Sequence, residues 1–438
     1  MTLSDKLKRI VLAKAYEYLD KDPEQNMPKL IDWVEVLDRN GDFARQLPEA
    51  KRIAGDPSCN WYRLAQSFWY DVDGEVRKTL FTNFVINGRL LAVPSLTENR
   101  KKYGCNIPWA ILLDPVPDAH SGVEGDGLSF DEMDGILEQG KELGTYFYLF
   151  SGGEPLLRRD DLIALCNKNF DCEFLLFTDG TRIDDNFADE LLRVKNLIPV
   201  FKVDGFEEET DLRRGRGTYA AQCRGMEILR AHKLPFGVSC HYTEENGKTL
   251  GSEEFFDELI RRGVKFAWFF PDMPTGKCGG QLVTAEQREY MYHQLRAFRK
   301  TKPLLTLDLL NDNGYVGGCT AAGKSYCHIN AAGDLEPCAF VHYSDSNLRG
   351  KTLLEAYCSP LFREFYRNQP FHSNLLRSCP LLDDPDRLVA MVEASGARPT
   401  GQDAEEDVRD LAHRCAKCAE DWAVIADRLW EESGTARR

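Results

Sequence analysis

The feature that most constrains this fold is a regular alternation of short apolar runs with amphipathic stretches, which begins near Trp109. Each apolar run has the length of a buried strand, and each following stretch has apolar residues at helical spacing. Six units follow one another, with strands expected at residues 109–113, 146–150, 174–177, 198–203, 236–240 and 266–270. This repetition predicts parallel strands joined by right-handed crossover helices. A full barrel has eight units, so we expect an α/β fold, either a partial (β/α)6 barrel or an open wound sheet.

Two segments without this repeat flank the predicted barrel. Residues 1–100 are expected to be helical, because apolar residues recur at helical spacing over residues 6–19 and 43–53. After about residue 310 the periodicity lapses, and cysteine, glycine and proline become frequent. The sequence therefore predicts three regions: a helical N-terminal region at 1–100, the barrel at 101–310 and a Cys-rich domain at 311–438.

Charge and hydropathy argue against two classes of partner. The formal net charge of −15 argues against a nucleic-acid-binding surface. No apolar run approaches the roughly 20 residues that cross a bilayer, so we expect no membrane partner and a cytoplasmic location. Thiols stay reduced in that compartment. The 14 cysteines are therefore expected to be metal ligands or small core residues.

The residues after each predicted strand form a candidate ligand site. In parallel α/β folds the working residues sit at the carboxyl ends of the strands. Here those ends carry Asp114-Pro115, Gly152-Gly153-Glu154-Pro155, Thr178-Asp179-Gly180, Asp204-Gly205, Cys240-His241 and Pro271-Asp272. Glycines and acids at nearly every end suit a small polar ligand across the mouth. The alternative is ordinary turn chemistry.

Five cysteines in the C-terminal region form a candidate metal site. Cys319 and Cys338 bracket a glycine turn at Gly333, and Cys379, Cys415 and Cys418 lie downstream. Thiolates gathered from separate turns hold iron–sulfur clusters or structural zinc, and five suffice for one [4Fe–4S] cluster or one zinc ion. The alternative is a set of incidental buried thiols.

Taken in order along the chain, these motifs resemble the radical S-adenosylmethionine superfamily with a SPASM/Twitch-type C-terminal extension. The Gly152-Gly153-Glu154-Pro155 turn and the segment Phe177-Thr178-Asp179-Gly180-Thr181 are similar to the family's motifs after its second and third strands. The segment around Asp204, with Arg213 and Arg214 following, is similar to the fourth-strand region of its peptide-modifying members. The Cys319-x13-Gly333-x4-Cys338 spacing falls within the opening pattern of the extension. The likeness covers roughly residues 105–420.

The resemblance implies cofactors and roles for particular residues. The family binds a [4Fe–4S] cluster through Cys-x3-Cys-x2-Cys after the first strand, and its open iron chelates S-adenosylmethionine for reductive cleavage to a radical. By position, the turn containing Gly152, Gly153, Glu154 and Pro155 would meet the methionine amino group. Arg213 or Arg214 would meet its carboxylate, and Asp204 or Thr178 the ribose side. Cys319, Cys338, Cys379, Cys415 and Cys418 would hold one auxiliary [4Fe–4S] cluster, because a full SPASM set has more cysteines.

The chain departs from the family at the loop that should bind the radical-generating cluster. Residues 114–127 contain no cysteine, and Cys-x3-Cys-x2-Cys occurs nowhere in the chain. His120, Glu124 and Asp126 could bind a divalent ion, although a solvated linker is the preferred interpretation of this glycine-rich loop.

Three functional hypotheses follow from this departure. The first is a family member without its radical centre, which binds S-adenosylmethionine, a peptide or protein substrate, or a competent paralogue. The second is an active enzyme whose gene model or clone has lost part of the loop. The third is a metal-binding interaction module that uses only the C-terminal cysteines. Taken as written, the sequence is expected not to cleave S-adenosylmethionine reductively.

Overall fold

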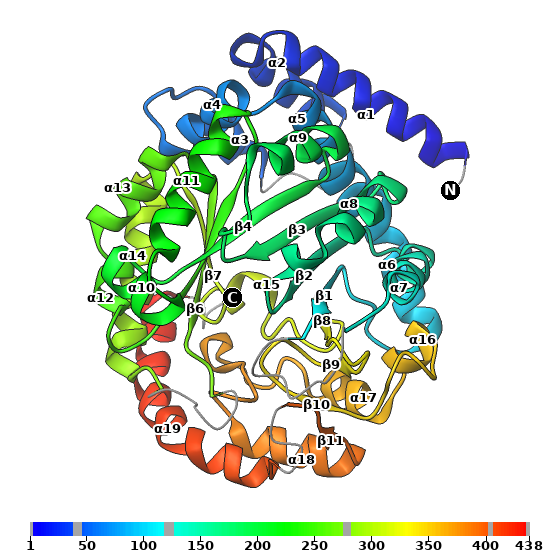
Figure 1. Ribbon diagram of the computed structural model, residues 1–438, viewed down its shortest axis with the longest axis vertical. Coiled ribbons are helices and arrows are strands. Elements are labelled where there is room, and N and C mark those ends of the chain that lie inside the picture. The colour runs from blue at the N-terminus through cyan, green and yellow to red at the C-terminus, as the bar shows by residue number, and fades with distance from the viewer. Residues whose placement is uncertain (1–2, 38–45, 118–126, 275–281, 402–405, 435–438) are drawn as a thin grey trace.

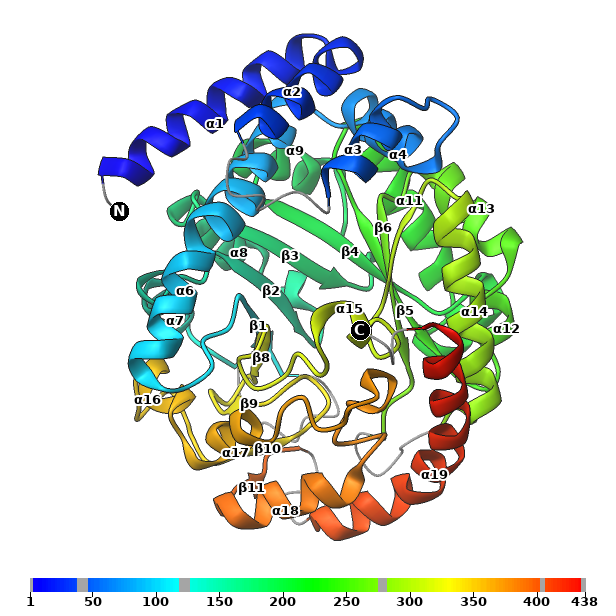
Figure 2. The same ribbon diagram turned by 180° about the vertical axis from the view of Figure 1, so that it is seen from behind.

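The computed structural model describes residues 3–37, 46–117, 127–274, 282–401 and 406–434. A twisted sheet of parallel strands occupies the centre, helices cover its outer face, and the N-terminal helices lie across one end (Figures 1 and 2). The first six strands are β1 (Ala110–Val116), β2 (Phe147–Gly152), β3 (Glu173–Thr178), β4 (Leu197–Val203), β5 (Gly237–Tyr242) and β6 (Phe266–Pro271). These six match the strands that the alternating pattern predicts.

Three more strands extend the sheet beyond the six predicted units. They are β7 (Leu305–Asp308), β8 (Tyr326–Ile329) and β9 (Leu335–Glu336), and the spatial order is β7-β6-β5-β4-β3-β2-β1-β8-β9. All neighbouring pairs are parallel except β8 and β9, which form an antiparallel hairpin. The predicted α/β class with a parallel-strand core is confirmed. The sheet also runs across residue 310, where the sequence predicted a domain boundary.

Helices follow the strands as the crossover pattern requires. Those on the outside of the sheet are α7 (Phe130–Leu143), α8 (Arg159–Lys168), α9 (Asp185–Val194), α10 (Glu207–Arg214), α11 (Thr218–Ala231), α12 (Gly247–Leu250), α13 (Glu253–Arg262) and α14 (Ala285–Thr301), with the short 3-10 helix η2 (Pro155–Arg158) before α8. Ser129 begins α7 with a reciprocal capping box to Glu132, and Gly144 ends it in the left-handed conformation. Local signals thus fix where this crossover helix starts and stops.

The N-terminal region is helical, as predicted. Its helices are α1 (Leu3–Lys21), α2 (Pro23–Leu37), α3 (Leu47–Ala54), α4 (Asn60–Asp71), α5 (Gly74–Leu80), the π-helix η1 (Phe81–Leu91) and α6 (Ala92–Tyr103). Phe84 of η1 contacts the rings of Trp109 and Phe147, which stack with their centroids 4.9 Å apart. The indole nitrogen of Trp109 donates to the carbonyl of Gly88 at 2.7 Å. This aromatic group fills the barrel at the amino ends of β1 and β2, which leaves the carboxyl ends as the side for a ligand.

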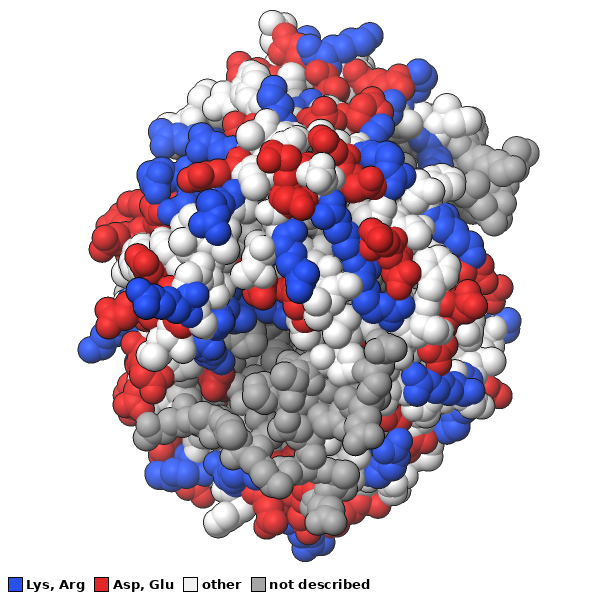
Figure 3. Space-filling model, in the orientation of Figure 1, with Lys and Arg blue, Asp and Glu red and all other residues white. Residues whose placement is uncertain are grey.

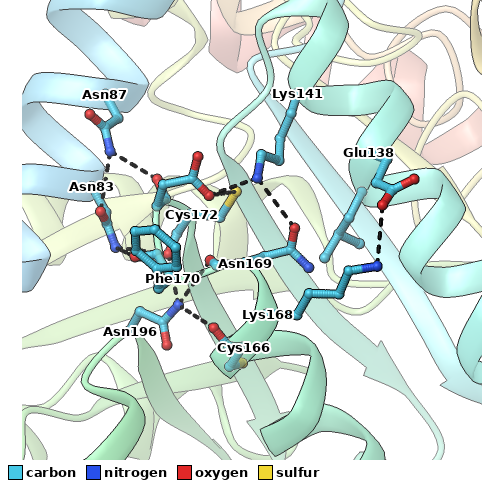
Figure 4. A network of polar contacts seen from close by, with 12 residues as sticks. Asn83, Asn87, Glu138, Lys141, Cys166, Lys168, Asn169, Phe170, Cys172 and Asn196 are labelled. Carbon is cyan, nitrogen blue, oxygen red and sulfur yellow. Dashed lines mark hydrogen bonds and ion pairs between the residues drawn. The ribbon is translucent and has the colours of Figure 1, made fainter. Parts of the chain in front are cut away.

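A network of amides fastens η1 to the turn before β3 (Figure 4). Asn83 donates to the carbonyls of Phe170 and Cys172, each at 2.9 Å, and Asn87 donates to the carbonyl of Asp171 at 2.9 Å. Asn196, from the segment before β4, donates to carbonyls of the same turn. Backbone groups that a buried turn would leave unpaired are therefore satisfied from both sides.

The C-terminal segment wraps the sheet edge and packs on α14. Its elements are α15 (Asn313–Val316), β10 (Tyr343–Ser344), α16 (Leu353–Tyr357), α17 (Pro360–Asn368), η3 (Leu375–Arg377), α18 (Pro385–Ser395), β11 (Arg398–Pro399) and α19 (Val408–Glu432). The Arg288 guanidinium of α14 bonds Asp383 at 2.6 Å and lies 3.9 Å from the ring centroid of Trp422 on α19. Both charged side chains are almost fully buried. Removal of either one would leave the other as an uncompensated buried charge, which is strongly destabilising. No helix in the described part of the chain has the length and apolar character to span a membrane.

Acidic and basic side chains are interspersed over the face shown in Figure 3. Over the whole chain, 70 aspartates and glutamates outnumber 55 lysines and arginines. The expected absence of a nucleic-acid partner stays a prediction.

We predict that Glu173, at the start of β3, lowers stability as the pH rises. Its side chain is fully buried, and within the described residues neither carboxylate oxygen accepts a hydrogen bond. Burial raises its pKa well above 4.5, so the folded state retains a proton that the unfolded chain releases above that pH. The free energy of unfolding should therefore fall between pH 5 and pH 8, and Glu173→Gln should remove this part of the decline.

Chemical denaturation of both proteins at these two pH values measures the effect. Glu138→Gln on the exposed face of α7 is the matched control. Its free energy of unfolding should change with pH as that of the wild type does. An identical pH dependence in Glu173→Gln and wild type would show that Glu173 is ionised in the fold.

Candidate functional site

A tight backbone approach joins the ends of β1 and β2 at the barrel mouth. Gly152 has a φ of +80°, and a Cβ there would lie 2.4 Å from the carbonyl oxygen of Val116. The amide of Gly153 donates to that same oxygen at 3.2 Å. Only glycine fits at position 152, and the turn fixes where the carbonyls of Gly152 and Gly153 lie.

Lys202 on β4 binds the two glycine carbonyls. Its Nζ lies 3.1 Å from the oxygen of Gly152 and 3.0 Å from that of Gly153. Sequence analysis missed this residue. The available signal was a lysine within the otherwise apolar strand Leu197–Val203, in phase with the barrel-lining residues Ile198 and Val200.

Glu154 and Thr178 come together, as the strand-end pattern predicts. One oxygen of Glu154 accepts from the hydroxyl of Thr178 at 2.8 Å and from the amide of Leu156 at 3.0 Å. The other oxygen accepts from the amide of Asp179 at 2.8 Å. Burial raises the pKa of Glu154, although these hydrogen bonds oppose the shift. Pro155 begins η2 directly after this carboxylate.

Asp204, Arg213 and Arg214 form an ion-pair group at the end of β4. Asp204 is bonded by the Nε of Arg214 and lies 3.6 Å from the Nε of Arg213. Arg213 also bonds Asp272, after β6, at 2.7 Å. The sequence predicted these three residues at one site, and the structure brings them together as partners of one another.

His241, at the end of β5, is neutral in this setting. Burial lowers its pKa to about 3, and the positive charges of Arg214, Arg213 and Lys202 act in the same direction. The mouth therefore has three cationic side chains around an uncharged imidazole.

A buried group of histidines and acids lies at the end of β1. The Nε2 of His328 lies 2.9 Å from Oδ2 of Asp114, and its Nδ1 lies 2.8 Å from Oε2 of Glu336. The Nδ1 of His342 lies 3.0 Å from the same oxygen of Glu336. Burial by itself lowers the pKa of His328, but the two carboxylates outweigh it and raise the pKa to about 10. Sequence analysis named Asp114 and missed the other three residues.

Three of the five predicted metal-binding cysteines share one cavity. Cys319, Cys338 and Cys379 line it together with apolar side chains and Tyr326. Burial raises the pKa of the Cys319 thiol to about 12 and that of Cys338 to about 11, so metal binding must displace their protons.

Cys415 and Cys418 lie on α19 and are not among the described residues that line this cavity. The sulfur of Cys418 lies 3.5 Å from the carbonyl oxygen of Val283, before α14. Ligation by these two helix cysteines stays a prediction.

The residues after β1 do not fit a cluster held by three thiolates. No cysteine occurs between Cys105 and Cys166 in the sequence. Cys105 precedes β1, and its sulfur lies 3.4 Å from that of Cys358. The predicted alternative ligands His120, Glu124 and Asp126 lie outside the described residues.

The chain is similar to one family model and to several known proteins. The family model described as "Radical SAM superfamily" matches residues 104–251. The chain is 23% identical over 280 residues to an AdoMet-dependent heme synthase of Oleidesulfovibrio alaskensis, covering 57% of this chain and 71% of that protein. It is 26% identical over 175 residues to a serine-type anaerobic sulfatase-maturating enzyme of Klebsiella aerogenes, covering 35% and 41%.

Two solved structures are similar in part. Streptococcus suis SuiB bound to S-adenosylmethionine has a TM-score of 0.48 and 15% identity, covering 61% of this chain and 68% of that chain. The enzyme anSMEcpe with bound AdoMet and Cp18Cys peptide has a TM-score of 0.47 and 16% identity, covering 74% and 99%.

Proposed function

We propose that this chain, which belongs to the radical SAM superfamily through residues 104–251, keeps the barrel and one auxiliary cluster of its relatives but lacks their radical-generating centre. In this proposal the chain binds S-adenosylmethionine, a peptide or protein, or a competent paralogue, and does not generate a radical. The observation that carries it is the absence of cysteine from residues 114–127, the loop after the first strand in which the family has three.

The contacts of Lys202 support the same conclusion. The family resemblance assigns the turn containing Gly152 and Gly153 to the amino group of S-adenosylmethionine. Here an ammonium of the protein itself already binds both carbonyl oxygens, at 3.1 and 3.0 Å. A ligand ammonium would have to displace Lys202 or share its acceptors, which costs the hydrogen bonds that Lys202 makes.

Of the two arginines that the resemblance offers for the ligand carboxylate, Arg213 and Arg214, the second is engaged in a similar way. Arg214 bonds Asp204, whose side chain is almost fully buried. Separating this pair would leave a buried carboxylate with less compensation. The polar groups proposed to bind S-adenosylmethionine are therefore already bonded to other groups of the protein. This supports weak binding of that ligand.

One auxiliary [4Fe–4S] cluster fits the C-terminal cavity better than a zinc ion does. Cys319, Cys338 and Cys379 line the cavity from three separate turns. Among the described residues, however, these thiols do not form a set with three ligand atoms within 4.8 Å of one another. A mononuclear ion needs ligands gathered that closely, whereas a cluster spaces them apart.

A peptide or protein, or a catalytically competent paralogue, is the proposed partner, and the cytoplasm the proposed location. The relative named as a sulfatase-maturating enzyme supports a protein partner. The relatives named as AdoMet-dependent heme synthases favour a second candidate, an active enzyme whose loop is incomplete in this sequence.

Product analysis separates the two candidates. We predict that the full chain, reconstituted anaerobically and supplied with dithionite and S-adenosylmethionine, forms no 5′-deoxyadenosine above a protein-free control. It should hold about four irons, as one [4Fe–4S] cluster requires. Deoxyadenosine in amounts that rise with protein concentration would establish the active enzyme instead.

Removal of the Lys202 ammonium is predicted to strengthen S-adenosylmethionine binding by at least about tenfold. A hydrogen bond to a charged group contributes roughly 1.5–3 kcal/mol, and about 1.4 kcal/mol corresponds to a factor of ten. Calorimetric titration of Lys202→Ala with S-adenosylmethionine measures the change. Lys248→Ala, at an exposed position on α12, is the control and should bind as wild type does. Equal affinity in the two variants would mean that Lys202 does not compete with the ligand.

Substitution of a cavity cysteine is predicted to remove the auxiliary cluster. Cys338→Ala should lower iron content and the melting temperature of the reconstituted chain, because metal binding contributes to folding free energy. Cys223→Ala on α11, remote from the cavity-lining residues, should keep both values. Wild-type iron in Cys338→Ala would exclude this cavity as the cluster site.

A further inference from the structure

Two histidines and a glutamate converge where the Cys-rich segment meets the first strand. His328 lies on β8, Glu336 on β9, and His342 just before β10. The two Nδ1 atoms lie 2.8 and 3.0 Å from the same carboxylate oxygen. Within the described part of the chain, this is the group whose three ligand atoms all lie within 4.8 Å of one another.

The hairpin explains how the sequence builds this group. His328 and Glu336 are directly opposed partners in the antiparallel β8–β9 register, so their side chains lie on one face. Gly333, with a φ of +84°, forms the turn between them. Residues eight positions apart are thereby placed within hydrogen-bond distance.

Two of the three ligand side chains, those of His328 and Glu336, are oriented by a further partner on the far side. The Nε2 of His328 faces Oδ2 of Asp114 at 2.9 Å. The second oxygen of Glu336 accepts from the amide of Asn330 at 2.9 Å and from the hydroxyl of Thr400 at 2.5 Å. A carboxylate that holds the outer nitrogen of a histidine, with a hydrogen-bonded ligand carboxylate beside it, is the usual outer shell of a protein metal site.

Hydrogen bonds satisfy the carboxylate of Asp114 only in part. Its Oδ1 is buried and has no hydrogen-bond partner among the described residues. Asp114 and Glu336 place two carboxylates beside two imidazoles, and buried carboxylates need compensating positive charge. A bound divalent cation would supply this charge in place of the imidazole protons, and the imidazoles would then ligate in their neutral form.

We propose that His328, His342 and Glu336 bind one divalent first-row transition metal ion, and that Asp114 positions His328. Two imidazoles and one carboxylate suit ions such as Fe²⁺, Co²⁺ and Zn²⁺. Three protein ligands leave coordination positions open for water or a substrate oxygen. The side chain of His342 is 29% exposed, which gives an ion a path from solvent.

The proposed ligands are distinct from the cysteines of the neighbouring cavity. None of the three is among the described residues that line the cavity of Cys319, Cys338 and Cys379. Metal binding by these three residues does not depend on whether the chain cleaves S-adenosylmethionine, because they lie outside the turn after β2.

Cobalt titration tests the proposal, because Co²⁺ reports its ligands by absorption. The metal-free full chain should bind one Co²⁺ with weak visible bands and without the intense near-ultraviolet charge-transfer band of thiolate ligation. Glu336→Gln, which preserves shape, and His342→Ala, at a partly exposed position, should each weaken binding at least tenfold. His293→Ala, at an exposed histidine on α14, should bind as wild type does.

Circular dichroism of each variant confirms folding before titration. Wild-type affinity in folded Glu336→Gln and His342→Ala would overturn the proposal. So would the absence of Co²⁺ binding by the folded wild-type chain, or a thiolate band that disappears in Cys338→Ala.

Discussion

The parallel pairing of β1 with β8 is the constraint on which the remaining structure depends. The register pairs Leu112 with His328 and Ala110 with Tyr326, so a strand from the Cys-rich segment becomes part of the barrel sheet. Tyr326 borders the cysteine cavity, while His328 reaches Asp114 at the end of β1. One strand pair therefore positions both candidate metal sites. A shift of one residue would turn His328 and Tyr326 to the opposite face of the sheet.

Most polar side chains at the barrel mouth are bonded to other groups of the protein. Lys202 bonds the glycine carbonyls, Arg214 bonds Asp204, and Glu154 accepts hydrogen bonds from the β3 end. These pairings stabilise the mouth without a ligand, because buried polar groups that lack partners are costly. A polar ligand can bind here only if its own hydrogen bonds and ion pairs are more favourable than those it displaces.

The opposite end of the barrel is closed by packing and by amides. Phe84, Trp109 and Phe147 fill its interior, and Asn83 and Asn87 hold η1 against the turn before β3. The N-terminal region thus contributes to the barrel core itself as well as covering it. The lysine, arginine and histidine side chains converge at the other end of the barrel, at the carboxyl ends of the strands.

Three features can be read from the residues alone: the strand–helix units, the placement of Glu154, Thr178 and Asp204 at strand ends, and the lack of cysteine at residues 114–127. Each of these depends on local periodicity or on residue identity. Three features come from the tertiary structure alone: Lys202 binds the glycine carbonyls, His328 meets Asp114, and one cavity is lined by Cys319, Cys338 and Cys379. Cys415 and Cys418 are not among the described residues that line this cavity. The contact between His328 and Asp114 spans 214 positions along the chain. Sequence periodicity reports which face of an element is buried, but partners this distant are set by strand register and packing, which no local pattern encodes.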